Sequence, residues 1–348
     1  MRIAVDGMGS DNRPVPDVAG AVMAAREWGD EILLVGPEAT LRAELAKHDA
    51  TGLPITVVHA PEVIGMEEHT DAVKAKKDSS IRVGMRLVKE GEADAFVSAG
   101  NTAAVLAAAL FDLGRIRWAS GRVRRPALAT IYPVADNPVL LIDNGATTDC
   151  RPEDLVQFAR MGAAYVERVW GVPNPRVGLV SNGEEPEKGS LLVRDTFALL
   201  AESGLNFVGN VEPKEITKGK TDIALTDGFT GNVMLKTTEA IAAFLLRHLR
   251  RELTDGTVDK VGLALMIPGL LAMSPGLLLL LPSLRRIVRR MDYAEYGGAL
   301  LMGVNGVVVI GHGRSNAKAV KNAIRQARRA VESGALEAVR AGLAGEEG

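Results

Sequence analysis

The stretch Ala95-Phe-Val-Ser-Ala-Gly-Asn-Thr-Ala-Ala104 decides how the rest of the chain is interpreted. A short apolar run ends at Ser98, small residues follow, and an Ala- and Leu-rich helical pattern begins at once. Asn101 or Thr102 can cap that helix, and Gly100 allows a ligand to approach the backbone closely. The free N–H groups of a first helical turn favour an anion, although a helix end contributes only about 0.3 to 2 kcal/mol. An anion site therefore needs further cations and donors, and the alternative is an ordinary strand-to-helix turn.

Length and composition exclude several classes of protein. With 348 residues the chain can bury a large core without disulfides or structural metals. A hydrophobic content of 47%, a charged content of 24% and a net charge of −2 are ordinary for a globular protein and argue against nucleic-acid binding. The lone cysteine, Cys150, excludes an internal disulfide and indicates a reducing compartment. The apolar run from Ile3 to Val5 is too short for a signal peptide, so we expect a cytoplasmic protein.

Strand and helix patterns alternate along most of the chain. Apolar runs of four or five residues are separated by helical patterns, which predicts an α/β fold with a mostly parallel sheet and helices on both faces. We expect residues 1–348 to form a single catalytic unit. The expected strands are residues 3–5, 31–35, 55–58, 95–98, 125–132, 138–143, 176–180, 207–210, 222–226 and 303–310. Residues 125–132 and 138–143 are expected to be antiparallel neighbours because the link between them is short.

Polar residues follow several of these strands, at the carboxyl ends where ligands bind in such sheets. The turn from Asp227 resembles the first stretch, because Gly231 and Asn232 precede a helix that carries Lys236. We expect this turn and the one at Asn101 to face each other across a cleft. Further candidates for the same edge are Asp6, Lys77, Ser79, Ser80, Asp143, Asn144 and His312. For residues 74–81 the alternative is a solvated loop.

Residues 261–284 contain no charged residue and suggest contact with a membrane. Pro268, Pro275 and Pro282 interrupt the segment every seven residues, so no uninterrupted helix is long enough to span a bilayer. Basic residues flank both ends, and we expect 247–290 to form a helical hairpin that enters one anionic leaflet. The alternatives are a hairpin buried in a dimer interface and a true span. The leucines expected to contact the membrane are Leu270, Leu271, Leu277, Leu278, Leu279, Leu280 and Leu281.

The sequence favours neither a metal, nor a cofactor, nor covalent catalysis. The five histidines form no cluster, and Cys150 has no histidine near it in the sequence. No G-x-S-x-G motif occurs, and Asn12 stands where the third glycine of G-x-G-x-x-G would be. Asp6, Asp143 and other carboxylates could hold Mg²⁺ but as readily orient donors or cap helices. The remaining interpretation is a phosphate held by helix starts and lysines, acting on a carbonyl of an apolar substrate.

Ordered motifs run along nearly the whole chain. They are Asp6-Gly-Met-Gly-Ser-Asp11, Lys77-Asp-Ser-Ser80, Ser98-Ala-Gly-Asn-Thr102, Asp143-Asn-Gly-Ala146, Asn182-Gly-Glu-Glu-Pro-Glu-Lys-Gly189, Gly209-Asn-Val-Glu212, Asp227-Gly-Phe-Thr-Gly-Asn-Val233, Leu235-Lys-Thr237, Tyr296-Gly-Gly298 and His312-Gly313. In this order they resemble the bacterial PlsX phosphate acyltransferases. One departure is Gly311, where a lysine is common in that family.

The resemblance implies an acyl-ACP:phosphate acyltransferase of bacterial phospholipid biosynthesis. A fatty acyl thioester on acyl carrier protein (ACP) and inorganic phosphate would give acyl phosphate and free ACP. It also implies a fold similar to phosphotransacetylases and isocitrate dehydrogenases, and a homodimer. A membrane glycerol-phosphate acyltransferase is considered as a further partner, at the inner face of the cell membrane. The arginines from Arg115 to Arg125 are candidates for contact with ACP, with a solvated loop as the alternative.

Our hypothesis for the mechanism is direct attack of phosphate on the thioester. Lys188 stabilises the oxyanion or the phosphate, Asp227 orients a lysine, and Asn232 with the amides from Gly231 to Val233 binds phosphate or carbonyl oxygen. Asn101 and Thr102 form the second anion cradle. Replacing Lys188 by alanine should then cost about 2 to 4 kcal/mol in kcat/KM. The alternatives are an enzyme related to NAD-dependent decarboxylating dehydrogenases, and a non-catalytic scaffold at the membrane surface.

Overall fold

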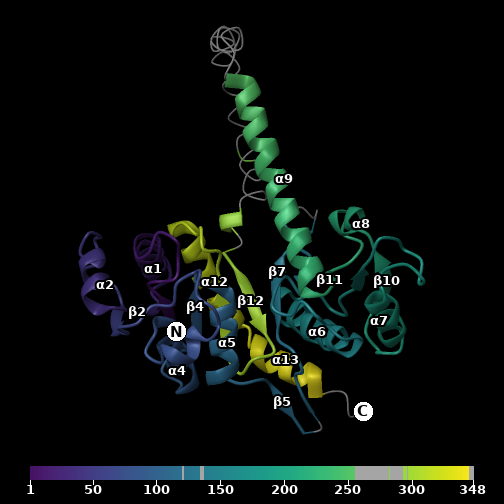
Figure 1. Ribbon diagram of the computed structural model, residues 1–348, viewed down its shortest axis with the longest axis horizontal. Helices are drawn as coiled ribbons and strands as arrows, with labels where there is room; N and C mark the ends of the chain where they lie inside the picture. Colours follow the sequence, from purple (N-terminus) through teal and green to yellow (C-terminus); the bar gives the residue numbers. More distant parts are fainter. Residues whose placement is uncertain (120, 134–136, 255–281, 283–292, 296, 345–348) are drawn as a thin grey trace.

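The computed structural model describes residues 1–119, 121–133, 137–254, 282, 293–295 and 297–344 (Figure 1). Within these ranges eleven strands form one sheet in the order β10-β9-β11-β8-β7-β12-β13-β4-β1-β2-β3, beside a small β5–β6 hairpin. The strands are β1 (Arg2–Asp6), β2 (Glu31–Gly36), β3 (Ile55–His59), β4 (Ala95–Ser98), β5 (Arg117–Trp118), β6 (Gly121–Arg122), β7 (Ala127–Ile131), β8 (Leu140–Ile142), β9 (Val177–Val180), β10 (Phe207–Val211), β11 (Ile223–Leu225), β12 (Ala299–Met302) and β13 (Val307–Ile310).

Helices connect most of these strands, as the alternating pattern predicts. They are α1 (Val15–Trp28), α2 (Glu38–Leu45), α3 (Ala72–Ala75), α4 (Ser80–Lys89), α5 (Thr102–Asp112), α6 (Pro152–Tyr165), α7 (Leu191–Ala201), α8 (Pro213–Thr217), α9 (Gly228–Thr254), α12 (Ala317–Glu332) and α13 (Ala335–Ala344), with a π-helix η1 (Val166–Trp170) and a 3₁₀ turn η2 (Tyr293–Glu295). The predicted α/β fold with a mostly parallel sheet is confirmed.

The direction of the parallel strands reverses at the centre of the sheet. Strands β3, β2, β1, β4 and β13 are parallel to one another, and so are β8, β11, β9 and β10. Between the two groups, β12 pairs antiparallel with both β13 and β7, and β7 pairs antiparallel with β8. The β7–β8 pairing agrees with the prediction, whereas β12 was not predicted. These three junctions make the two parallel groups run in opposite directions, so their carboxyl ends lie at opposite edges of the sheet.

The two faces of the sheet are covered differently. On one face α1, α12, α13, α6 and α7 pack side by side over one large core cluster. On the other face the core is divided into a cluster around Phe96, beneath α4 and α5, and a smaller one around Leu141, which Met234 and Leu235 of α9 contact. The central strands β7, β12 and β13 contribute Leu128, Leu301, Val308 and Ile310 to the first of these clusters.

Helix α9 begins earlier than the sequence pattern suggested. The Oδ1 atom of Asp227 accepts hydrogen bonds from the N–H groups of Phe229 at 3.0 Å and Thr230 at 2.9 Å, which caps the helix. Gly231 and Asn232 therefore lie inside its first turns and not before it. At about 1.5 Å per residue the 27 residues extend roughly 40 Å, and Figure 1 shows the far end of α9 projecting beyond the other labelled helices and strands.

The expected membrane hairpin cannot be placed on this fold. Apart from the end of α9 and the few residues named above, the stretch 247–290 lies outside the described residues, and so do all seven leucines expected to contact the membrane. None of the helices that the structure describes combines the length and the apolar character needed to cross a bilayer.

Candidate active site

A cavity of about 600 Å³ lies over the middle of the sheet, between α5 and α9. Strands β7, β12 and β13 line it with Leu128, Thr130, Ala299 and Ile310. The start of α5 lines it as well, and so do the turn after β8 and the early turns of α9. The predicted site residues that line this cavity are Gly100, Asn101, Thr102, Asn144, Asn232, Lys236 and His312. The structure thus places the two predicted helix openings around one hollow.

At the α5 end, Asn101 holds the cavity wall in place. Its Oδ1 atom accepts a hydrogen bond from the Ala104 N–H at 3.1 Å and caps α5. Its Nδ2 atom lies 3.2, 3.1 and 2.9 Å from the carbonyl oxygens of Gly65, Met66 and Glu68. Because the side chain is engaged within the protein, an anion at this end would be bound by the backbone N–H groups of the first turn and by the field of the helix end.

The turn after β8 is built around the buried carboxylate of Asp143. It accepts hydrogen bonds of 2.7 to 3.0 Å from the N–H groups of Leu128, Gly145, Ala146 and Thr147. Burial raises the pKa of Asp143, and these four amides act in the opposite direction. Asp143 therefore shapes the turn, and the next residue, Asn144, lines the cavity. Among the described residues the Oδ1 atom of Asn144 has no hydrogen-bond partner, which leaves an acceptor for a water or ligand donor.

Gly231 allows α9 to pass the end of β8 in direct contact. A Cβ atom at this position would lie 1.9 Å from the carbonyl oxygen of Asp143. The Gly231 N–H donates to the Asp227 carbonyl at 3.0 Å, so this amide belongs to the helix and is not the anion donor that we expected. The close approach brings Asn232 beside Gly145, where a Cβ atom would lie 3.7 Å from Asn232 Cγ.

The cavity combines charged groups with apolar walls. Helix α9 contributes Lys236 and Glu239, and the loop after β13 contributes His312, whose Nδ1 accepts a 3.2 Å hydrogen bond from the Arg314 N–H. The apolar lining side chains include Leu106, Leu128, Ile131, Leu235 and Ala242. A pocket with a few polar groups and extensive apolar walls suits a ligand that joins an anion to an apolar chain.

Asp6 lies below the cavity and does not line it. The side chain of Ser98 donates to Asp6 Oδ2 at 2.7 Å, and Ser80 also bonds to this carboxylate. Ser98 Oγ in turn accepts from the Gly100 N–H at 3.0 Å. Burial raises the pKa of Asp6. Asp6 and Ser80 thus support the turn before α5 from beneath, which differs from the predicted contact with phosphate.

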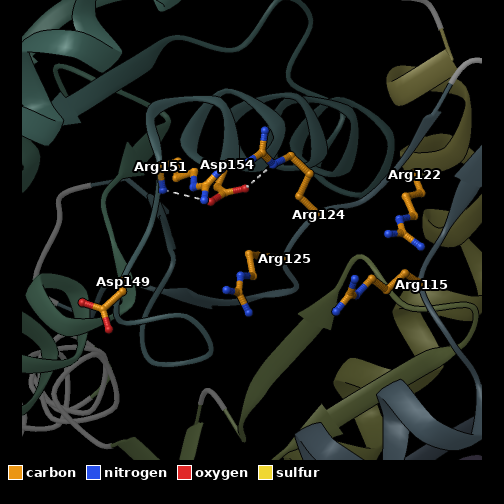
Figure 2. Close-up of a pocket in the computed structure, with 7 residues that line it drawn as sticks. All are labelled: Arg115, Arg122, Arg124, Arg125, Asp149, Arg151 and Asp154. Atoms are coloured by element: carbon orange, nitrogen blue, oxygen red, sulfur yellow. Dashed lines mark hydrogen bonds and ion pairs between the residues drawn. The ribbon is translucent and has the colours of Figure 1, made fainter.

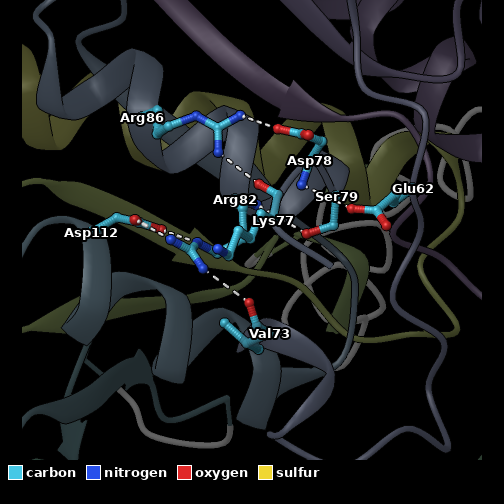
Figure 3. Close-up of polar contacts among 8 residues, drawn as sticks. All are labelled: Glu62, Val73, Lys77, Asp78, Ser79, Arg82, Arg86 and Asp112. Carbon is cyan, nitrogen blue, oxygen red and sulfur yellow. Dashed lines mark hydrogen bonds and ion pairs between the residues drawn. The ribbon is translucent and has the colours of Figure 1, made fainter. Parts of the chain in front are cut away.

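Figure 3 shows that the segment from Lys77 to Ser79 is bound to α4. Ser79 caps that helix by accepting from the Arg82 N–H at 3.4 Å, and the Lys77 carbonyl accepts from Arg86 Nη1 at 2.6 Å. Asp78 pairs with the same arginine at 2.9 Å. None of these residues lines the cavity. The predicted role of Lys77 and Ser79 in phosphate binding is not supported by this placement, and the first turn of α4 needs the serine as its cap.

Two residues predicted to be catalytic lie outside the cavity lining. Lys188 is exposed on the loop between β9 and α7, and its assigned role stays a prediction. In the described part of the chain the Asp227 carboxylate contacts the backbone N–H groups at the start of α9 and no lysine. The expected orientation of a lysine by Asp227 is therefore replaced by helix capping.

Several lining residues were missed in the sequence. Glu239 follows Lys236 by three residues on α9, and this spacing places both on one side of the helix. Thr130 and Ala299 belong to the central strands, whose polar or small residues carry no local signal. Met66 lies in a loop without regular structure, and its carbonyl accepts a hydrogen bond from Asn101 Nδ2 at 3.1 Å. Of these residues, Glu239 alone had a sequence signal that could have identified it.

Metal and thiol chemistry have little structural support in the residues described. No group of three or more His, Cys, Asp and Glu side chains in these ranges is placed to hold a metal ion. Burial raises the pKa of Cys150 to about 12, and its Sγ donates to the Thr147 carbonyl at 3.3 Å. A thiol with so high a pKa is a poor nucleophile at neutral pH.

Comparison with solved structures defines the class of fold. The EutD phosphotransacetylase from Staphylococcus aureus aligns with a TM-score of 0.58 over 96% of this chain and 94% of its own, at 14% sequence identity. A likeness at this identity concerns the fold alone, and it places the divided sheet in the phosphotransacetylase-like class of folds.

Sequence comparison is more specific. Residues 1–338 match the family described as "Fatty acid synthesis protein". The protein "Phosphate acyltransferase" of Desulforamulus reducens is 48% identical over 100% of this chain and 99% of its own length. The protein of the same name from Herpetosiphon aurantiacus is 47% identical over 95% of each. The chain belongs to the PlsX family of phosphate acyltransferases.

Proposed function

We propose that this protein transfers a fatty acyl group from acyl-ACP to inorganic phosphate, giving acyl phosphate and free ACP for phospholipid synthesis. The observation that carries the proposal is the single cavity that joins the start of α5, the turn after β8 and α9 over an apolar floor. It offers an anion site and room for an aliphatic chain side by side, and membership of the phosphate acyltransferase family supports the same reaction.

In the proposed reaction a phosphate oxygen attacks the thioester carbonyl and the pantetheine thiolate leaves. A thiolate is a good leaving group, so positioning and electrostatic stabilisation should supply most of the rate. We assign the phosphate to the α5 end and to Lys236 and His312, the basic side chains among the described lining residues. Asn232, which lies beside Gly145, would donate to the developing oxyanion.

We further propose a homodimer that works at the inner face of the cell membrane. Support for the dimer comes from the outer side of α9, where Val233, Ile241, Phe244 and Leu245 are each at least half exposed. These positions fall within one side of the helix, away from the cavity-lining Leu235 and Ala242. An exposed apolar surface of this kind usually marks an interface. The membrane contact through residues 261–284 and the acyltransferase partner rest on the sequence.

Incubation of the purified protein with palmitoyl-ACP and ³²P-phosphate tests the reaction. We expect labelled acyl phosphate and release of free ACP in equal amounts. Consumption of NAD with Mg²⁺ in place of this product would favour the dehydrogenase alternative. Binding to anionic vesicles without any loss of acyl-ACP would favour the scaffold. The acyl-phosphate product should be absent when phosphate is replaced by sulfate, which serves as the control.

A further inference from the structure

Five of the described arginines line a second hollow, of about 390 Å³, and one of them, Arg122, belongs to the β5–β6 hairpin (Figure 2). They come from separate segments: after α5, in β6, before β7 and before α6. The lining residues of this arginine hollow are Arg115, Arg122, Arg124, Arg125, Arg151, Asp149 and Asp154.

The positive charge of the hollow is only partly balanced. Arg124 pairs with Asp154 at 3.0 Å and lies 3.7 Å from a Glu153 oxygen. Within the described residues Arg115, Arg122 and Arg125 form no ion pair, and Figure 2 shows them around open space. Like charges closer than a Debye length, about 8 to 10 Å, repel one another. An anionic partner would relieve this repulsion.

The form of the hollow favours a protein surface over a small anion. A phosphate site gathers buried, convergent donors, whereas Arg122, Arg125 and Arg151 are exposed and reach the hollow from different segments. Exposed arginines spread over such a hollow can each meet a different carboxylate of an acidic helix or loop. Electrostatic complementarity of this kind raises association rates.

The arginine hollow adjoins the candidate active site through two segments of chain. Arg125 lines the hollow and Leu128 the active-site cavity, three residues apart, which is about 10 Å of extended chain. The segment after β8 also lines both the active-site cavity and the arginine hollow, with Ala146 in the cavity and Asp149 in the hollow. A partner bound at the hollow would therefore stand beside the Asn144 end of the cavity.

We propose that the arginine hollow is the docking site for an acidic protein surface. This inference rests on the proposed function, under which the partner is the carrier protein that presents the acyl thioester to the cavity. The arginines hold the carrier while its flexible prosthetic arm places the thioester at the turn after β8.

The test compares the full-length chain with the double variant Arg122→Glu/Arg125→Glu and with Arg194→Glu. Arg194 is an exposed arginine on α7 outside both cavities and serves as the matched control. Binding is measured with immobilised ACP that carries a thioether-linked palmitoyl chain, at low and high salt. We expect the double variant to bind about tenfold more weakly or worse, and to lose most of the salt dependence. Arg194→Glu should match the wild type, and Arg125→Lys should retain most of the binding.

Turnover separates the docking proposal from the proposed function. The double variant should lose kcat/KM for palmitoyl-ACP by a similar factor, with an unchanged KM for phosphate and unchanged turnover of uncharged palmitoyl-pantetheine. Equal carrier binding in all variants would overturn the docking site even if the enzyme is active. A raised phosphate KM with normal carrier binding would also overturn it, in favour of a small-anion site. Absence of acyl phosphate from wild-type protein and palmitoyl-ACP would instead refute the proposed function.

Discussion

Asn101 connects two parts of the cavity wall through one carboxamide, as cap of α5 and as donor to the loop at residues 65–68. Loss of one helix cap costs about 1 to 2 kcal/mol. Replacing Asn101 by alanine should cost more than this, because three partly buried carbonyl oxygens also lose their donor. Catalytic efficiency should fall because Met66 and the first turn of α5 move. Urea unfolding and kcat/KM measure the two effects.

The matched control is Asn316, which caps α12 by accepting from the Ala319 N–H at 2.9 Å and does not line the cavity. Replacing Asn316 by alanine should cost the cap alone and leave kcat/KM nearly unchanged. If both alanine variants lose the same stability and the same activity, the link from Asn101 to the loop has no importance for the site.

Asp17 on α1 should make the stability of the protein depend on pH. Its carboxylate accepts from Ser10 Oγ at 2.5 Å, and burial, with a smaller effect of Asp6, raises the pKa of Asp17 to about 7. In the unfolded chain the pKa is about 3.9, so the folded state binds the extra proton. The contribution of Asp17 to the free energy of unfolding is thus complete below pH ~4. It falls by up to about 4 kcal/mol as the pH rises to ~7.

The Asp17→Asn variant keeps an acceptor for Ser10 but cannot ionise. Its free energy of unfolding, relative to the wild type, should rise by about 1.4 kcal/mol per pH unit between pH ~4 and ~7. Urea unfolding at several pH values measures this difference. Parallel pH curves for the two proteins would show that Asp17 does not titrate in this range.

Lys236 and Lys188 offer a direct comparison of two candidates for the charge that holds phosphate. Lys236 lines the cavity and Lys188 does not. We expect Lys236→Ala to raise the KM for phosphate and to cost about 2 to 4 kcal/mol in kcat/KM, as loss of an oxyanion donor does. Initial rates at varied phosphate measure the change. A large effect of Lys188→Ala with a small effect of Lys236→Ala would support Lys188 as the residue that stabilises the phosphate or the oxyanion. It would also require the β9–α7 loop to move over the cavity.

At the scale of elements, the contact between α9 and the end of β8 decides the shape of the cavity. Gly231→Ala would place a Cβ atom 1.9 Å from the Asp143 carbonyl and must displace the helix. Overpacking of this kind costs about 1 to 3 kcal/mol or more, and activity should fall further because Asn232 and Lys236 move with α9. Thermal unfolding and kcat/KM measure the two losses.

Gly162 on α6 is the control for this substitution. A Cβ atom there would make ordinary contacts of 3.4 to 3.6 Å with Ile223, Ile142 and Leu140. Gly162→Ala should therefore stabilise the protein by up to about 1 kcal/mol, since alanine favours a helix. If Gly231→Ala behaves like Gly162→Ala, α9 does not depend on the close approach.

At the scale of the whole molecule, the outer side of α9 should join two copies of the chain. Phe244→Glu places a charge in the apolar surface described above and should convert a dimer into a monomer. Light scattering after size-exclusion chromatography measures the mass. Leu199→Glu, at a partly exposed leucine of α7, should leave the mass unchanged. A monomeric wild type would contradict the proposed dimer.

Local sequence determined most of the helices and strands of this protein, whereas β5, β6 and β12 were not predicted. Apolar runs broken by helical patterns specify strands and helices, because periodicity and capping depend only on neighbours along the chain. The turn at Gly100 and Asn101 was identified in this way, and so was the antiparallel pair β7 and β8. Whole-chain similarity to phosphate acyltransferases added the family.

Tertiary structure alone decided which of these turns share a cavity. The direction of the strands reverses because β12 pairs antiparallel with β13, which follows it in the chain, and with β7, which is far away in the sequence. No local pattern encodes the pairing with β7. Asn101 and Asn232 line one cavity over the central strands, whereas Lys77 and Lys188 do not line it. Tertiary structure also decided the roles of individual side chains. Asp143 and Asp6 were expected to bind ligand, but they are buried and their hydrogen bonds stabilise the cavity wall.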